Sequence, residues 1–175
     1  MNSDADTPER NPFLEAVGRI TIAGAQLDNS LRTLLAAVAF EPTLLVSANA
    51  EGTARLIELC ELALTVHTAA PDDTAEIKAC LARARDLKEK RNQVVHSIFM
   101  HVEEGGGLQA FKPLRKRLGM SSSPITVAEM EATALKIEEL RVDMSVAGWN
   151  ARCAQSGMDR ISRSAPNADT TISKD

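Results

Sequence analysis

The sequence of 175 residues has no tyrosine and only four phenylalanines and one tryptophan, which excludes a core built on aromatic rings. Its three cysteines, Cys60, Cys80 and Cys153, are widely spaced and include no C-x-x-C pair, which argues against a disulfide framework and a zinc site. No stretch approaches the roughly 20 apolar residues that span a bilayer, and the polar start lacks a signal segment. We therefore expect a cytoplasmic protein with no metal and no other cofactor.

The residues that are abundant favour helices. Hydrophobic residues make up 44% of the chain, with many alanines and leucines, so one aliphatic core and one compact domain are expected. After about Gln155 the composition turns to Ser, Asp, Asn and Thr. We predict a flexible N-terminus at residues 1–10, a helical domain at residues 11–155 and a disordered tail at residues 156–175.

Periodicity and capping signals predict four helices. The first begins with Asn11 as N-cap and Pro12 in the first turn, and its apolar or small residues alternate at spacings of four and three, namely Ile20, Gly24, Leu27, Leu31, Leu34 and Val38. The second runs from about Glu51 to His67. These two helices offer more apolar surface than a small bundle covers comfortably.

The remaining helices are predicted from capping boxes. Asp73 and Glu76 form such a pattern at the start of the third helix, which should end between His96 and His101. Thr126 and Glu129 open the fourth, with a hydrophobic staple and an inner face of Met130, Ala134, Ile137, Leu140, Met144, Ala147 and Ala151.

Between the third and fourth helices the period changes. The segment SIFMHVEEGGGLQAFKPL, which starts at Ser97, has two short apolar runs around Glu-Glu-Gly-Gly-Gly, which indicates a hairpin or a long loop. The predicted fold class is therefore all-α: an up-and-down four-helix bundle with a short hairpin or loop insertion between helices three and four.

Charge is distributed unevenly along the chain. The net charge of −4 argues against non-specific coating of nucleic acid, which depends on many basic residues. Residues 83–91 nevertheless carry five basic and two acidic side chains, and residues 112–117 carry four basic and no acidic ones. These runs are either solvated faces or one shared basic patch. The candidate substrate-binding residues of such a patch are Arg83, Lys88, Lys112, Arg115, Lys116 and Arg117.

Arg91 interrupts the apolar stripe of the third helix. The positions around it are Ile77, Cys80, Leu81, Ala84, Leu87, Val94, Val95 and Ile98. An unpaired buried charge is too costly to retain, so an inward-facing arginine needs an acidic partner. Asp28, beside the stripe of the first helix, is the first candidate, and Glu61 and Glu89 are alternatives.

Asn92 and His96 lie near Arg91 on the same helix. They are four residues apart, so the Asn92 side chain can contact the imidazole, while Arg91 flanks the pair from the inner side. The three could converge in one polar pocket. The alternative is structural: Arg91 joins two helices, and His96 caps the helix C-terminus, where a cation is favoured.

The hexapeptide RNQVVH, from Arg91 to His96, resembles the motif of the HEPN superfamily (higher eukaryotes and prokaryotes nucleotide-binding domain). Members of that superfamily are small all-α bundles with Arg, four to six residues, then His, often with Asn, Asp or His after the Arg. The likeness of the helical body covers roughly residues 12–155. Active members are metal-independent ribonucleases, usually dimers with facing motifs, and many serve in toxin–antitoxin or phage-defence systems.

The resemblance implies that Arg91, Asn92 and His96 are catalytic residues and that the chain binds RNA as a homodimer. A cognate antitoxin or regulator protein is a further expected partner. The chemistry suits the residues, because His96 can exchange a proton at neutral pH and Arg91 offers a fork of donors to phosphate. Two other interpretations stay open: a non-catalytic helical protein–protein interaction domain, and a scaffold for a small nucleotide.

Overall fold

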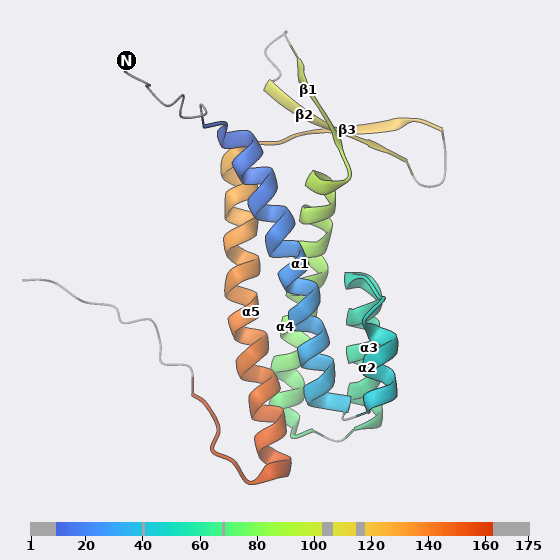
Figure 1. Ribbon diagram of the computed structural model, residues 1–175, viewed down its shortest axis with the longest axis vertical. Coiled ribbons are helices and arrows are strands. Elements are labelled where there is room, and N and C mark those ends of the chain that lie inside the picture. The colour runs from blue at the N-terminus through green and yellow to red at the C-terminus, as the bar shows by residue number, and fades with distance from the viewer. Residues whose placement is uncertain (1–9, 40, 68, 103–106, 115–117, 163–175) are drawn as a thin grey trace, which may run out of the picture.

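The computed structural model describes residues 10–39, 41–67, 69–102, 107–114 and 118–162. These residues form five helices and three strands (Figure 1). The helices are α1 (Pro12–Ala39), α2 (Pro42–Ala48), α3 (Thr53–Val66), α4 (Pro71–Val95) and α5 (Val127–Ser156), and the strands are β1 (Ile98–Val102), β2 (Gly107–Pro113) and β3 (Met120–Pro124). The chain is therefore mostly helical, as predicted, with a small sheet in place of a simple insertion. None of the described helices has an apolar stretch long enough to cross a bilayer.

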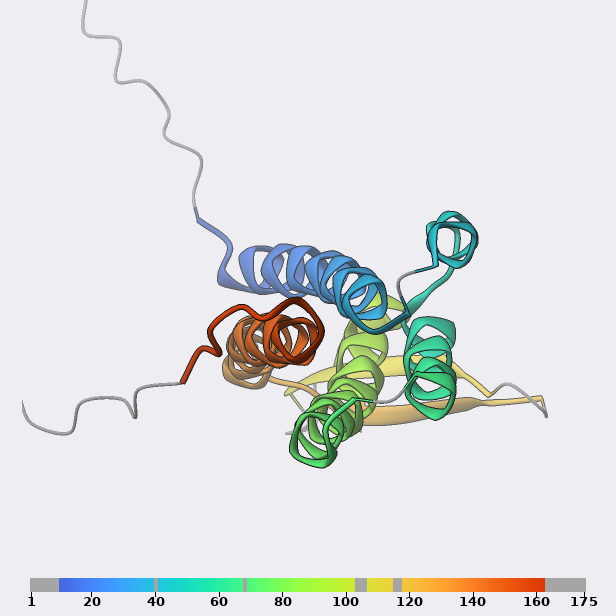
Figure 2. The same ribbon diagram turned by 90° about the horizontal axis from the view of Figure 1, so that it is seen from below.

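Four long helices form most of the core, and the short α2 lies beside them and adds Ala48 to it (Figure 2). The start of α3 contacts Asp28 of α1, and Cys60, farther along α3, contacts Leu31. Thus α1 and α3 run in the same direction, because α2 carries the chain back between them. The predicted up-and-down order is wrong at this point, since the sequence prediction missed α2, a helix of only seven residues that starts at Pro42.

The first turns of α1 and α5 are capped as the sequence predicts. The Asn11 side chain accepts hydrogen bonds from the backbone N–H groups of Phe13 and Leu14, at 3.1 and 3.2 Å. The Thr126 hydroxyl accepts from the Glu129 N–H at 3.1 Å, and the Glu129 carboxylate accepts from the Thr126 N–H at 2.9 Å, so the capping box is complete. All seven predicted inner-face residues of α5 are buried.

The predicted capping box at the start of α4 is wrong. The helix begins at Pro71 after Ala70, and no side chain caps it. Proline at the first position fixes the backbone there. The fully buried carboxylate of Asp73 instead accepts hydrogen bonds from Arg160, a residue after α5.

The insertion is a three-stranded antiparallel sheet in the order β1-β2-β3, placed across one end of the bundle (Figure 1). Of the two predicted alternatives, a hairpin or a long loop, the pairing of Ile98 with Phe111 and Met100 with Gln109 shows the hairpin. β3 was not predicted, because its sequence MSSSP has little strand propensity. Phe99 of β1 packs edge-on against Phe13 of α1, with ring centroids 5.0 Å apart, which attaches the sheet to the bundle.

The chain after α5 returns along that helix. Asn150 and Ile161 exchange two hydrogen bonds, from Asn150 Nδ2 to the Ile161 carbonyl at 3.1 Å and from the Ile161 N–H to Asn150 Oδ1 at 2.9 Å. The first residues of the predicted tail are therefore attached to α5. The rest of that tail, residues 163–175, and residues 1–9 of the predicted flexible N-terminus lie outside the described residues.

Candidate functional site

Arg91 lies on the face of α4 that packs against α1 and α3, and its side chain is only 16% exposed. Its Nη2 donates a hydrogen bond to Thr53 Oγ1 at 3.0 Å. The expected partner, Asp28, is present, with Oδ2 at 3.9 Å from Nη2, which is an ion pair without a direct hydrogen bond. The Thr53 hydroxyl donates in turn to Asp28 Oδ1. Thr53 therefore lies between the two charged groups.

Gly24 of α1 leaves the space that the Arg91 side chain occupies. A Cβ at this glycine would lie 2.8 Å from Arg91 Nε and 3.2 Å from its Cδ and Cγ. Nε itself is buried without a hydrogen-bond partner. The sequence prediction placed Gly24 in the packing stripe of α1, and the structure shows that a side chain of α4, Arg91, packs against it.

Thr53 is the residue of this site that sequence reasoning missed. It is the first residue of α3, follows the N-cap Gly52 and is 4% exposed. The sequence signal was weak, because a threonine at a helix start usually caps its own helix. The two hydrogen bonds of the Thr53 hydroxyl instead join α3 to α1 and α4.

His96 and Asn92 lie at the end of α4. His96 is the C-cap residue, with φ −112° and ψ 21°, and its backbone N–H donates to the Asn92 carbonyl at 3.3 Å. The His96 side chain is exposed and Asn92 is half-buried. His96 lies five residues, or about 7.5 Å along the helix axis, beyond Arg91. Within the described residues, no hydrogen bond connects the Arg91 guanidinium to either of these side chains.

The predicted basic patch is only partly described, and two of its described members, Arg83 and Lys88, form ion pairs within the chain. Arg83 forms an ion pair with Asp143 of α5, and Lys88 pairs with its neighbour Glu89 at 2.7 Å. Lys112 lies on β2, a strand of the sheet at one end of the bundle (Figure 1). The candidates Arg115, Lys116 and Arg117 lie outside the described residues.

The two alternative partners of Arg91 are engaged elsewhere. Glu61 accepts hydrogen bonds from Arg85 at 2.9 Å, and Glu89 contacts Lys88. Asp28 is therefore the carboxylate that balances Arg91 in the described part of the chain.

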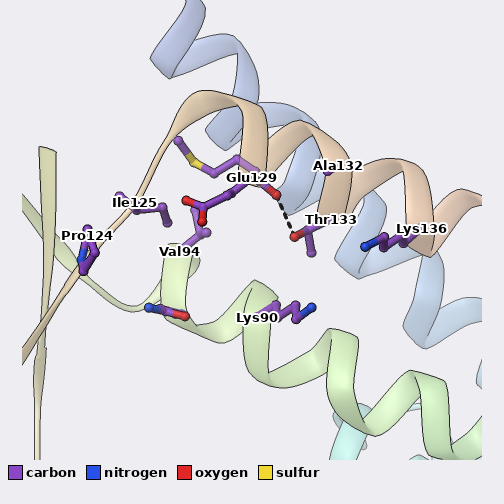
Figure 3. Close-up of a pocket in the computed structure, with 10 residues that line it drawn as sticks. Lys90, Val94, Pro124, Ile125, Glu129, Ala132, Thr133 and Lys136 are labelled. Carbon is purple, nitrogen blue, oxygen red and sulfur yellow. Dashed lines mark hydrogen bonds between the residues drawn. The ribbon is translucent and has the colours of Figure 1, made fainter. Parts of the chain in front are cut away.

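A cavity of about 250 Å³ lies between α4, α5 and the end of β3 (Figure 3). Lys90 of α4 and Lys136 of α5 line it from opposite sides, and Thr133 donates a hydrogen bond to the Glu129 carbonyl at 2.8 Å at its wall. Sequence reasoning did not find this cavity, because it needs the relative placement of two helices and a strand. No group of three or more His, Cys, Asp or Glu side chains suited to a metal ion occurs in the described segments.

Comparisons of the chain with protein-family models, with curated protein sequences and with solved structures gave no match. The resemblance to the HEPN superfamily therefore rests on the RNQVVH motif and the helical body around it.

Proposed function

We propose that this chain is a cytoplasmic, HEPN-like RNA-binding protein that cleaves RNA without a metal ion. The observation that carries the proposal is the arrangement at the end of α4, where a largely enclosed arginine is followed by an exposed histidine. Arg91 is held in place by its hydrogen bond to Thr53 and its ion pair with Asp28. His96 is open to solvent and can meet a substrate that approaches the helix end.

The proposed reaction is an internal transfer at phosphorus. The 2′-oxygen of a ribose loses its proton to His96 and attacks the adjacent phosphorus. The bond from phosphorus to the 5′-oxygen breaks, that oxygen takes up a proton from water, and His96 returns its own proton to the solvent. The products are a 2′,3′-cyclic phosphate and a 5′-hydroxyl end. Arg91 stabilises the charge on the phosphoryl oxygens, and Asn92 orients the imidazole or binds the same phosphate.

The proposal includes a homodimer and, in a toxin or defence system, a cognate antitoxin or regulator. The apolar side chains that α1 and α3 leave at the surface support it. Ile22 of α1 is 61% exposed, and Leu62 and Val66 of α3 are 58% and 69% exposed. Leu62 and Val66 are one turn apart on α3 and form an exposed apolar pair, and exposed apolar surface of this kind favours a protein partner.

The direct test is to incubate the purified protein with single-stranded RNAs of varied sequence in the presence of EDTA. The proposal predicts cleavage that EDTA leaves unchanged, with products that carry a 2′,3′-cyclic phosphate. Cleavage that stops with EDTA and leaves a 3′-hydroxyl would contradict the proposed chemistry.

A second candidate is a non-catalytic helical interaction domain in which Arg91 and His96 are structural. One observation favours it, since Arg91 is largely enclosed and its contacts with Thr53 of α3 and Asp28 of α1 join three helices. In this case neither cleavage nor salt-dependent RNA binding would be seen, and substitution of His96 would leave partner binding intact.

A further inference from the structure

We infer that Thr53 is a positioning residue for Arg91, and that it acts as a spacer that keeps the guanidinium from closing onto Asp28. The inference rests on the proposed function, since it assigns to Thr53 the placement of the group that binds phosphate. It also fixes which protons of Arg91 a phosphate can reach.

The direction of the hydrogen bonds follows from the hydroxyl group. A threonine hydroxyl has a single proton, and in Thr53 this proton goes to Asp28 Oδ1. Its lone pairs then accept from Arg91 Nη2 at 3.0 Å. The chain of bonds therefore runs from Arg91 through Thr53 to Asp28, and the carboxylate makes the hydroxyl a better acceptor for the guanidinium.

The spacing of the two charges shows why the hydroxyl matters. Arg91 and Asp28 are 16% and 20% exposed, so water screens their attraction only partly. Their nearest atoms are nevertheless 3.9 Å apart, longer than a charge-assisted hydrogen bond of about 2.8 Å. Without the Thr53 hydroxyl, Arg91 and Asp28 would each lose a partner. They would then pair directly, with the guanidinium drawn toward Asp28 of α1.

The same contacts limit what Arg91 can offer a ligand. Its guanidinium has five N–H protons. The Nε proton is buried against Gly24, and one Nη2 proton goes to Thr53. Both Nη1 protons and the second Nη2 proton remain, because no hydrogen bond among the described residues uses them. A phosphate group can accept hydrogen bonds from these three protons.

The test compares Thr53→Val, which keeps the shape and removes the hydroxyl, with Thr53→Ser, which keeps the hydroxyl. We expect Thr53→Val to lower kcat for RNA cleavage by about 10²-fold, the usual effect of misplacing one preorganised donor, with little change in KM. Thr53→Ser should stay within about threefold of wild type, because a hydroxyl restores the acceptor. Thermal unfolding of each variant shows whether it is folded at the assay temperature.

A second measurement does not depend on catalysis. The rate at which the Arg91 Nε proton exchanges with solvent can be followed by ¹⁵N NMR, with the signal assigned from Arg91→Lys. Exchange should be slow in wild type and in Thr53→Ser, and its rate should differ in Thr53→Val. The exposed Arg55 serves as the fast-exchanging control. If the wild-type protein does not cleave RNA but shows these exchange rates, the ribonuclease proposal is refuted and the spacer role of Thr53 is supported. Equal cleavage and equal exchange in wild type and Thr53→Val would overturn the spacer.

Discussion

At the scale of single residues, the planar guanidinium of Arg91 can form two parallel hydrogen bonds to a phosphate, which an ammonium group cannot reproduce. Arg91→Lys should therefore lower RNA cleavage by about 10²-fold while a positive charge remains next to Asp28. Cleavage rates measured beside Arg55→Lys, a change at an exposed arginine paired with Glu58, provide the control. Equal rates in the two variants would show that Arg91 supplies charge alone.

Cys60 gives a prediction of pH dependence. Burial raises the pKa of its thiol from 9.0 to about 12, with a smaller contribution from Glu61. Because the pKa of this group is higher in the folded state, its stabilising contribution is complete below pH 9 and is lost as the pH rises toward 12. Urea unfolding at pH 8 and pH 11 should show a larger loss of stability in wild type than in Cys60→Ala. An identical loss in the two proteins would contradict this assignment.

Part of the site could be predicted from the sequence. Arg91 was identified because it interrupts an apolar stripe, and Asp28 because a buried charge needs a nearby acid. Thr53 was not identified, since its role depends on how far α3 is shifted along α1. That shift is set by the packing between helices, and the periodicity of a single helix gives no information about it.

At the scale of secondary-structure elements, the capping box of α5 is a local device with a measurable effect. Thr126→Ala removes the acceptor for the Glu129 N–H, so the free energy of unfolding should fall by about 1 kcal/mol. Ser145→Ala, a change on an exposed face of the same helix, is the control and should have a smaller effect. Urea denaturation measures both, and equal losses would contradict the cap.

Elements with strong local signals were predicted well, and those without were not. Both α1 and α5 begin with a side-chain cap and continue with a long apolar period. By contrast, α2 is short and β3 is rich in serine, so neither reaches the length or composition that a sequence pattern requires. The start of α4 was misplaced because Asp73 pairs with Arg160, a contact distant in sequence.

At the scale of the whole molecule, the exposed apolar residues of α1 and α3 lead us to predict a homodimer. Ile22, Leu62 and Val66 are all more than half exposed, and a stable interface should bury at least about 1,000 Å² in total. Light scattering at micromolar concentration should give twice the chain mass of 18.8 kDa. Leu62→Glu should shift the mass toward the monomer. A wild-type mass near 18.8 kDa would contradict the dimer.

The most direct measurement compares the cleavage rates of wild type, His96→Ala and His101→Ala on single-stranded RNA with EDTA present. His101 is an exposed histidine on β1, so its loss matches that of His96 in side-chain type and exposure. If His96 transfers the proton, His96→Ala should lower the rate by about 10² to 10⁴, and His101→Ala should leave it near wild type. Circular dichroism confirms that each variant is folded. Equal rates for the two histidine variants, or no cleavage by the wild-type protein, would contradict the proposed function.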